Sequence, residues 1–216
     1  MFRKQFFLYI FIFFFSLFLI CHCPSAYAQE QAKDYLRLAH NFLEIKDFHQ
    51  AAHYLRRAVE LEPKQAEIHD LLGVTYERLG QYEKAVESFQ RAISLKPKEA
   101  VYHSHLAIAY YDNKELNKAI QTSLQTVSLD PRVDKYYHNL GLFYFENKEY
   151  QQAVEAYRKA AQLQPQDAEY QSKLGLAYIK LENLPQAIKS FQMAVNLEPE
   201  NSIYNYYLGL AYYHAK

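Results

Sequence analysis

The chain has 216 residues; half of them are hydrophobic, 16% are aromatic, and 24 basic side chains balance 24 acidic ones. This balance argues against a nucleic-acid partner, because nucleic-acid binding favours a basic stripe. The sequence contains no Gly-rich phosphate loop and no H-E-x-x-H or G-x-S-x-G motif. We therefore expect neither an enzyme nor a cofactor.

Residues 1–28 have the pattern of a signal peptide. Arg3 and Lys4 give a basic start, Phe6–Ile20 is an apolar run, and small residues at positions 26 and 28 suit a cleavage site. We predict cleavage after Ala28. The alternative is an uncleaved inner-membrane signal anchor, although the run is shorter than the roughly 20 apolar residues that a spanning helix needs.

Both cysteines, Cys21 and Cys23, lie within this segment. They follow Ile20 and His22 rather than the small residue of a lipidation site, which argues against a lipoprotein. Cleavage leaves a thiol-free chain that suits an oxidising compartment and has no stable membrane span. We expect a periplasmic or secreted protein.

The stretch Ala66–Pro97 reads as two amphipathic helices joined by a turn. Leu72 and Tyr76 lie four residues apart on one face of the first helix. Gly80 can take the left-handed conformation that ends a helix, and Pro97 ends the second helix. Helices this short need neighbours to bury their apolar faces. The stripe of the second helix is Ala85, Phe89 and Ala92.

The neighbours come from a period of 34 residues, and a fixed helix–turn–helix period is typical of a solenoid. A proline closes each unit, at Pro63, Pro97, Pro131, Pro165 and Pro199. A leucine followed by a small residue marks each first helix, at Leu38, Leu72, Leu106, Leu140, Leu174 and Leu208. An aromatic residue comes four positions after each leucine, at Phe42, Tyr76, Tyr110, Tyr144, Tyr178 and Tyr212.

These markers resemble the tetratricopeptide repeat, and the match runs from Ala32 to Lys216. The resemblance implies an all-α fold, a right-handed α-solenoid of five full repeats and the first helix of a sixth. The array occupies residues 29–216. Its repeats fall at about 32–65, 66–99, 100–133, 134–167 and 168–201, with a partial repeat at 202–216.

The second helix expected over Leu116–Leu129 departs most from the pattern. Ser123 stands where an aromatic residue is expected, and Thr126 stands where Ala is expected. Either the sequence has drifted and nearby tyrosines fill the space, or this repeat is a soft point at which the array flexes. The candidate tyrosines are Tyr102, Tyr136 and Tyr137.

Two asparagines stand just before the turns of their repeats. We expect Asn113 and Asn147 to take the left-handed role that Gly80 takes in the second repeat. In the first repeat, His49 and His53 lie at a spacing that can share a zinc ion. No third ligand is evident beside them, so we expect no metal site.

The last segment, Ser202–Lys216, is a first helix that lacks its pair, and it is apolar or aromatic on nearly every face. A helix of this kind is usually buried against another part of the protein or against a partner. Either it is a contact helix for a partner or a second copy of the chain, or it frays at a truncated end. The contact residues that we predict are Ile203, Tyr206 and Tyr207.

The resemblance also implies a partner-binding groove lined by the first helix of each repeat. The Lys–Asn clamp of the chaperone-binding members is absent, because Leu36 and His40 occupy its first positions. An apolar groove suits a helix or an extended segment of a protein. Part of this ladder could instead pack within the solenoid. The groove residues are Val74, Ile108, Tyr111, Lys135, His138, Leu142, Phe145, Leu176, Ile179, Lys180, Leu210 and Tyr213.

Two functions fit these features. The first is an adaptor that binds a protein or peptide partner within a bacterial cell-envelope assembly, such as a pilus, secretion or outer-membrane machine. The second is a periplasmic holdase-like chaperone for hydrophobic segments. A structural homo-oligomer that associates through the last helix is a further possibility.

Overall fold

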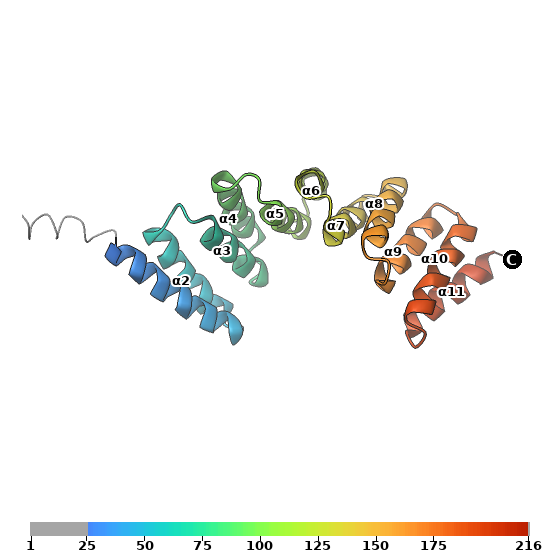
Figure 1. The fold of residues 1–216 in the computed structure, drawn as a ribbon, viewed down its shortest axis with the longest axis horizontal. Coiled ribbons are helices and arrows are strands. Elements are labelled where there is room, and N and C mark those ends of the chain that lie inside the picture. The colour runs from blue at the N-terminus through green and yellow to red at the C-terminus, as the bar shows by residue number, and fades with distance from the viewer. Residues whose placement is uncertain (1–25, 216) are drawn as a thin grey trace, which may run out of the picture. The chain divides into compact units, whose positions relative to one another are not determined.

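The computed structural model describes residues 26–215, and all regular secondary structure within that range is helical (Figure 1). The prediction of an all-α fold of helix–turn–helix pairs is confirmed. A first helix covers residues 26–44 of the described range. It is followed by α2 (Phe48–Leu61), α3 (Ala66–Arg78), α4 (Tyr82–Leu95), α5 (Ala100–Asp112), α6 (Leu116–Leu129), α7 (Asp134–Glu146), α8 (Tyr150–Leu163), α9 (Ala168–Lys180), α10 (Leu184–Leu197) and α11 (Ser202–His214).

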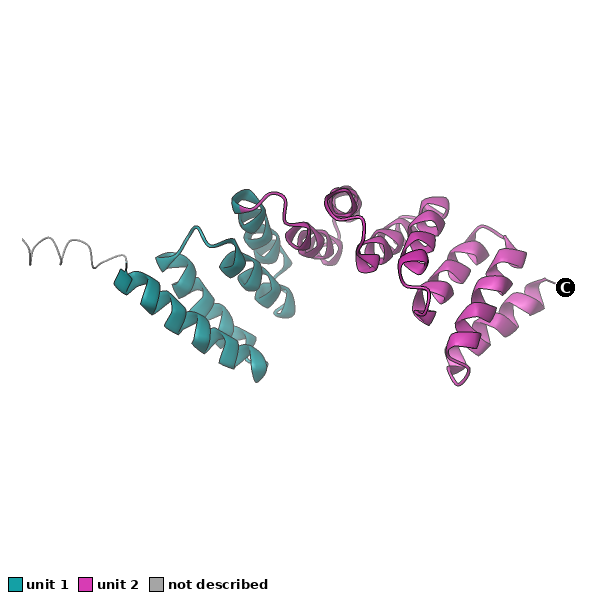
Figure 2. Cartoon of the chain, in the orientation of Figure 1, with its two compact units in different colours: residues 1–95 teal, residues 96–216 magenta. Residues whose placement is uncertain are grey.

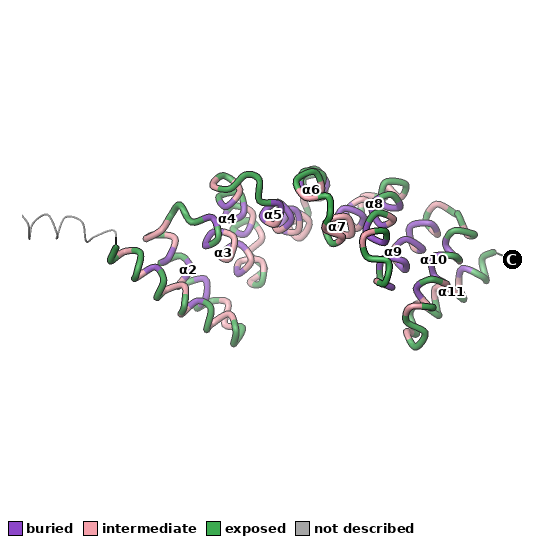
Figure 3. Tube along the Cα trace, viewed as in Figure 1, coloured by how far each residue is buried: buried purple, intermediate pink, exposed green. Residues whose placement is uncertain are grey.

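The chain forms two compact units (Figure 2). Unit 1 comprises residues 1–95, and its described part holds helix 26–44 and α2 to α4. Unit 2 comprises residues 96–216 and holds α5 to α11. Within each unit, the buried positions lie on the faces by which neighbouring helices pack, and the turns are largely exposed (Figure 3).

Small residues on the first helices seat aromatic rings from the second helices. A Cβ added at Gly73 would lie 2.6 Å from the ring of Phe89, and one at Gly175 would lie 2.7 Å from that of Phe191. Both rings are almost fully buried. Glycine is therefore required at these positions by close approach, because any side chain would overlap the ring. Gly141 and Tyr157 form the equivalent pair between α7 and α8.

The third repeat has a different pair of residues at these positions. Ala107 and Ser123 occupy the equivalent positions, and both are buried. The larger residue on the first helix accompanies the smaller one on the second, so the space that an aromatic ring would need is reduced. Thr126 is also buried, and its hydroxyl donates to the carbonyl of Thr122 at 2.9 Å. Tyr102, one of the tyrosines expected to fill this region, is buried.

The turn within each repeat depends on one residue with a left-handed backbone. Gly80 has φ 68°, as predicted, and its N–H donates to the carbonyl of Glu77 at 2.9 Å. The prediction for the asparagines is wrong, because Asn113 and Asn147 have φ −77° and −78°. In every full repeat, the left-handed residue lies one position after the site that Asn113 and Asn147 occupy. In the other repeats it is Lys46, Lys114, Lys148 or Glu182.

The asparagines instead brace the turn with their side chains. The amide of Asn113 donates to the Glu115 carboxylate at 2.8 Å, and that of Asn147 donates to Glu149. Each bond links the end of one helix to the residue just before the next, which satisfies polar groups that the turn exposes.

The predicted signal peptide lies almost entirely outside the described residues, and only its last residues, 26–28, fall within the first helix. Its cleavage therefore stays a prediction. Among residues 26–215, none of the helices combines the length and the apolar character that crossing a bilayer requires.

Candidate functional site

Unit 2 carries a row of apolar side chains on its first helices, which we call the ninth-position row. Its members come from α5, α7, α9 and α11, and each is only half-buried. Because the period is fixed, the four residues occupy the same position on successive first helices. The row is Ile108, Leu142, Leu176 and Leu210.

The predicted ladder beside this row is partly internal. Tyr111 stacks on Phe143 with ring centroids 5.0 Å apart, and Phe145 meets Tyr150 edge-on at 5.4 Å. Phe145 and Ile179, together with Leu176 of the row, pack against the buried cluster that contains Phe191. These residues therefore help to hold the helices together.

Three of the remaining predicted groove residues are exposed in unit 2, and one lies in unit 1. Lys135, Lys180 and Tyr213 are exposed in unit 2. Val74 lies on α3, so it belongs to unit 1 and is not part of the ninth-position row as defined here.

His138, one of the predicted groove residues, lies against aromatic rings from two other helices. Its ring lies 5.8 Å from the ring of Tyr157 and 5.2 Å from that of Tyr170, and its side chain is 20% exposed. Burial lowers the pKa of His138, and the nearby Glu169 carboxylate, 3.7 Å from Nε2, opposes that shift. Nε2 has no hydrogen-bond partner among the described residues. His138 therefore belongs to the packing between α7, α8 and α9.

A hydrogen bond beside His138 ties α9 to α7. The hydroxyl of Tyr170 donates to the Asp134 carboxylate at 2.5 Å. Burial and this carboxylate raise the pKa of Tyr170, so the hydroxyl keeps its proton and remains a donor.

The predicted contact helix, α11, is only partly available. Ile203 and Tyr206 are exposed, at 57% and 64%. The ring of Tyr207 stacks on Phe191 of α10 at 5.5 Å, so this predicted contact residue also packs within the unit. A Cβ added at Gly209 would meet nothing within 4 Å, unlike those at the equivalent glycines Gly73, Gly141 and Gly175.

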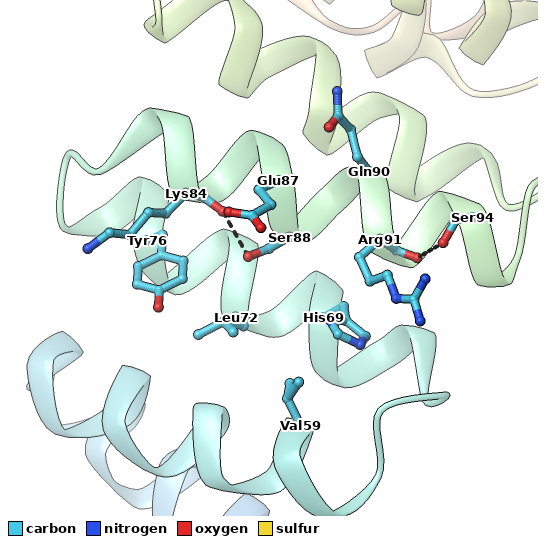
Figure 4. A pocket seen from close by; sticks show the side chains of 10 residues that line it. All are labelled: Val59, His69, Leu72, Tyr76, Lys84, Glu87, Ser88, Gln90, Arg91 and Ser94. Atoms are coloured by element: carbon cyan, nitrogen blue, oxygen red, sulfur yellow. Dashed lines mark hydrogen bonds between the residues drawn. The ribbon is translucent and has the colours of Figure 1, made fainter.

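Each unit also contains a crevice that the sequence did not predict. The crevice of unit 1 has a volume of 640 Å³ and lies between α2, α3 and α4 (Figure 4). Leu72 and Val59 form its apolar part, with His69 and Arg91 towards one end and Tyr76 and Lys84 towards the other. The complete lining is Val59, His69, Leu72, Tyr76, Lys84, Glu87, Ser88, Gln90, Arg91 and Ser94.

Hydrogen bonds hold two of these side chains in place. His69 Nε2 lies 3.0 Å from the carbonyl oxygen of Pro63, the residue that closes the preceding repeat. Lys84 Nζ donates to Gln81 at 2.9 Å and lies 5.5 Å from the ring centroid of Tyr76. The crevice thus combines an apolar floor with Lys84, Glu87 and Arg91, charges of both signs.

The crevice of unit 2 has a volume of 470 Å³ and lies between α8, α9 and α10. Arg158 Nη2 donates to the hydroxyl of buried Tyr178 at 3.0 Å, which fixes the guanidinium beside the apolar floor. The lining contains two basic residues and no acidic one. It consists of Arg158, Ala161, Gln162, Pro165, Gln171, Leu174, Tyr178, Gln186, Lys189, Ser190 and Met193.

One sequence signal could have revealed these crevices. The tetratricopeptide pattern places a tryptophan three residues before the marker leucine. That position holds His69 in the second repeat and Gln171 in the fifth, and both side chains line a crevice. A tryptophan there would fill much of the space, because its side chain is far larger.

No group of three His, Cys, Asp or Glu side chains that could hold a metal lies together within residues 26–215.

Comparisons with known proteins identify the class to which this arrangement belongs. A Tetratricopeptide repeat profile matches residues 36–100 and 71–131, a TPR repeat profile matches residues 141–181, and a second Tetratricopeptide repeat profile matches residues 168–201. Together these matches span well over half of the sequence. The chain belongs to the tetratricopeptide-repeat family. A search of curated proteins gave no significant match.

Several solved structures share the fold. A MamA protein has 26% sequence identity and a TM-score of 0.74, and the match covers 81% of this chain and 96% of that one. The pilF protein of Pseudomonas aeruginosa has 21% identity and a TM-score of 0.71, with 87% of each chain covered. YrrB, described as a TPR protein with an unusual peptide-binding site, has 16% identity, a TM-score of 0.69 and coverage of 85% and 96%. The similarity to pilF and YrrB shows the fold alone.

Proposed function

We propose that this chain is a protein-interaction adaptor whose unit 2 binds a helix or an extended peptide along the ninth-position row. The observation that carries the proposal is the row itself, in which four apolar side chains remain partly exposed at one position of successive first helices. Regularly spaced apolar side chains suit an amphipathic helix or a hydrophobic segment. The peptide-binding site named for YrrB supports this use of the fold.

The test uses Leu142→Glu, alone and combined with Leu176→Glu, because Leu176 also packs against the core. A photo-crosslinking amino acid at Tyr213, which is exposed, should capture the partner in native cells, and both variants should lose that product. Gln121→Glu combined with Gln151→Glu is the matched control, since it adds the same charge at exposed positions of unit 2. Retained capture by variants with an intact helical circular dichroism spectrum would contradict the proposal.

The same experiment separates the adaptor from a chaperone. A single partner in stoichiometric amount supports an adaptor. Suppressed aggregation of unrelated unfolded proteins, lost in the same Leu142→Glu variant, would instead support a holdase.

We further propose that the protein is exported and that the adaptor works in a bacterial cell-envelope assembly. The support is the basic start, the apolar run and the small residues of positions 1–28. Mass spectrometry of the mature protein should find Gln29 as its first residue. An intact N-terminus, or a lipid on Cys21 or Cys23, would contradict export by cleavage after Ala28.

A second candidate is self-association through α11. This helix has no Lys, Arg, Asp or Glu, and Ile203, Tyr206 and Tyr213 are more than half exposed. Apolar patches of this kind mark contacts. Sedimentation should show a concentration-dependent dimer that Tyr206→Lys abolishes, whereas a monomer at high concentration would reject this candidate.

A further inference from the structure

The crevice of unit 2 opens on a different side of α9 from the ninth-position row. Successive residues of a helix are about 100° apart around the axis. Leu174 and Tyr178, which line the crevice, therefore point about 160° away from Leu176. The crevice is a surface separate from the row on which the proposed function depends.

The floor of this crevice is apolar and firmly supported. Leu174, Tyr178 and Ala161 are all buried, with exposures of 6%, 8% and 7%, so their positions are set by the packing of the unit. Met193 contributes an adaptable side chain that is 42% exposed. A volume of 470 Å³ lies within the range of sites that bind small groups or side chains.

The charge of the lining has one sign. Lys189 is exposed on α10, and Arg158 reaches the crevice from α8. Glu155 pairs with Arg158 Nη1 at 2.8 Å, but this carboxylate is not part of the lining, and the other nitrogen of the fork is bonded to Tyr178. A guanidinium has five N–H donors, so donors remain for an additional acceptor.

We infer that this crevice docks an acidic peptide segment of a partner protein. An apolar side chain of the segment lies on the floor formed by Leu174 and Met193, and a neighbouring Asp or Glu carboxylate meets Arg158 and Lys189. The charge complementarity selects an acidic segment, and the floor requires an apolar residue beside the acid. This docking site adds a second contact to the adaptor and does not depend on the ninth-position row.

The probe is a short fluorescent peptide with a central Phe-Leu pair flanked by Asp and Glu, titrated into the full chain and followed by anisotropy. Two control peptides keep the length, one with Lys in place of the acids and one with Ser in place of Phe-Leu. We expect binding of the acidic apolar peptide alone, and weaker binding as salt is added.

Variants locate the site. Lys189→Glu should weaken binding by about tenfold, because it places a like charge against the peptide carboxylate. Lys159→Glu is the matched control, since Lys159 is an exposed lysine of α8 outside the crevice, and it should change affinity by less than about twofold. Leu142→Glu should leave the affinity for this peptide unchanged, because Leu142 is not part of the crevice lining.

Three results would overturn the inference. They are no binding by the unmodified chain, equal affinity in Lys189→Glu and Lys159→Glu, or loss of binding in Leu142→Glu, which would place the peptide on the row. Circular dichroism of each variant confirms that the helices are intact. If partner capture through the row fails while this peptide still binds, the proposed function falls and the crevice stands.

Discussion

The crevices of the two units occupy the same positions of the repeat, three periods apart, and differ in charge. Leu72 and Tyr76 in unit 1 correspond to Leu174 and Tyr178 in unit 2, so the apolar floors are alike. The walls are not alike. Glu87 corresponds to Lys189, Lys84 to Gln186 and Arg91 to Met193.

This difference distinguishes the residues that the fold requires from the residues that a ligand would contact. The floor residues are marker positions, which the packing of one helix on another requires in every repeat. The walls come from exposed positions of the second helices, where substitution costs little stability. The repeat can therefore keep one crevice and change its chemistry, and only the crevice of unit 2 has a lining of a single charge sign.

The largest effect should come from removing the equivalent buried phenylalanine in each unit. This change tests whether the apolar floors of the two crevices depend on the same packing. Phe89 and Phe191 are equivalent and almost fully buried, so Phe89→Ala and Phe191→Ala should each lower the free energy of unfolding of their unit by about 3–5 kcal/mol. Chemical denaturation followed by circular dichroism measures both. A cost below about 1 kcal/mol in one unit would show that its aromatic seat is not part of the core.

The glycine seats give the next effect. Gly73→Ala and Gly175→Ala should cost about 1–3 kcal/mol, because the new Cβ overlaps a buried ring. Gly209→Ala is the matched control at the same position of α11, where nothing lies within 4 Å. There Ala should stabilise by up to about 1 kcal/mol through its helix propensity. A destabilising Gly209→Ala, measured by thermal unfolding, would mean that another segment packs closely on α11.

A smaller effect should follow when the α4 side of the unit 1 crevice is converted to the residues of α10 in unit 2. Lys84→Gln, Glu87→Lys and Arg91→Met together reproduce three of the differences. We expect this variant to bind a second molecule of the acidic apolar peptide, with an affinity within about tenfold of the first site. Titration calorimetry counts the sites. Glu83→Lys, an exposed change on α4 outside the crevice, should leave one site, and one site in the triple variant would contradict the role of the walls.

The smallest effect concerns pH. His138 of unit 2 corresponds to Asp70 of unit 1, and burial lowers the pKa of His138, with Glu169 and Asp167 opposing the shift and Lys173 adding to it. His138 therefore binds a proton more readily in the unfolded chain than in the folded chain. Stability should fall as pH drops below the ordinary histidine pKa of about 6.5, and His138→Gln should remove that part of the fall. Melting temperatures at pH 7.5 and 5.5 give the comparison, and an equal fall in both proteins would contradict it.

The sequence predicted the helix pairs well because their signals are local and repeated. Leu72 and Tyr76, or Ala85 and Phe89, lie within one helix. The period places the leucine and aromatic markers of the first helix six times along the chain, and the alanine marker of the second helix five times. The left-handed turn residue was misplaced by one position. The tendency of asparagine to adopt a left-handed backbone pointed to Asn113. The geometry of the turn instead requires that conformation at the next residue, Lys114.

The site was predicted less completely. The ninth-position row follows directly from the period, but whether a member faces solvent or the core depends on neighbouring helices. Tyr207 looked available in its own helix, and only the packing of α10 places Phe191 against it. His138 lies between Tyr157 and Tyr170, which come from two other helices.

The sequence by itself therefore determined the class of fold and the period of the repeat, because the signals for both lie within one pair of helices and recur along the chain. The tertiary structure alone decided the crevices. Their linings come from three helices of two consecutive repeats, so Arg158, Tyr178 and Lys189 meet only after those repeats have packed. Charge at such a site depends on distances in space, which the spacing of residues along one helix does not specify.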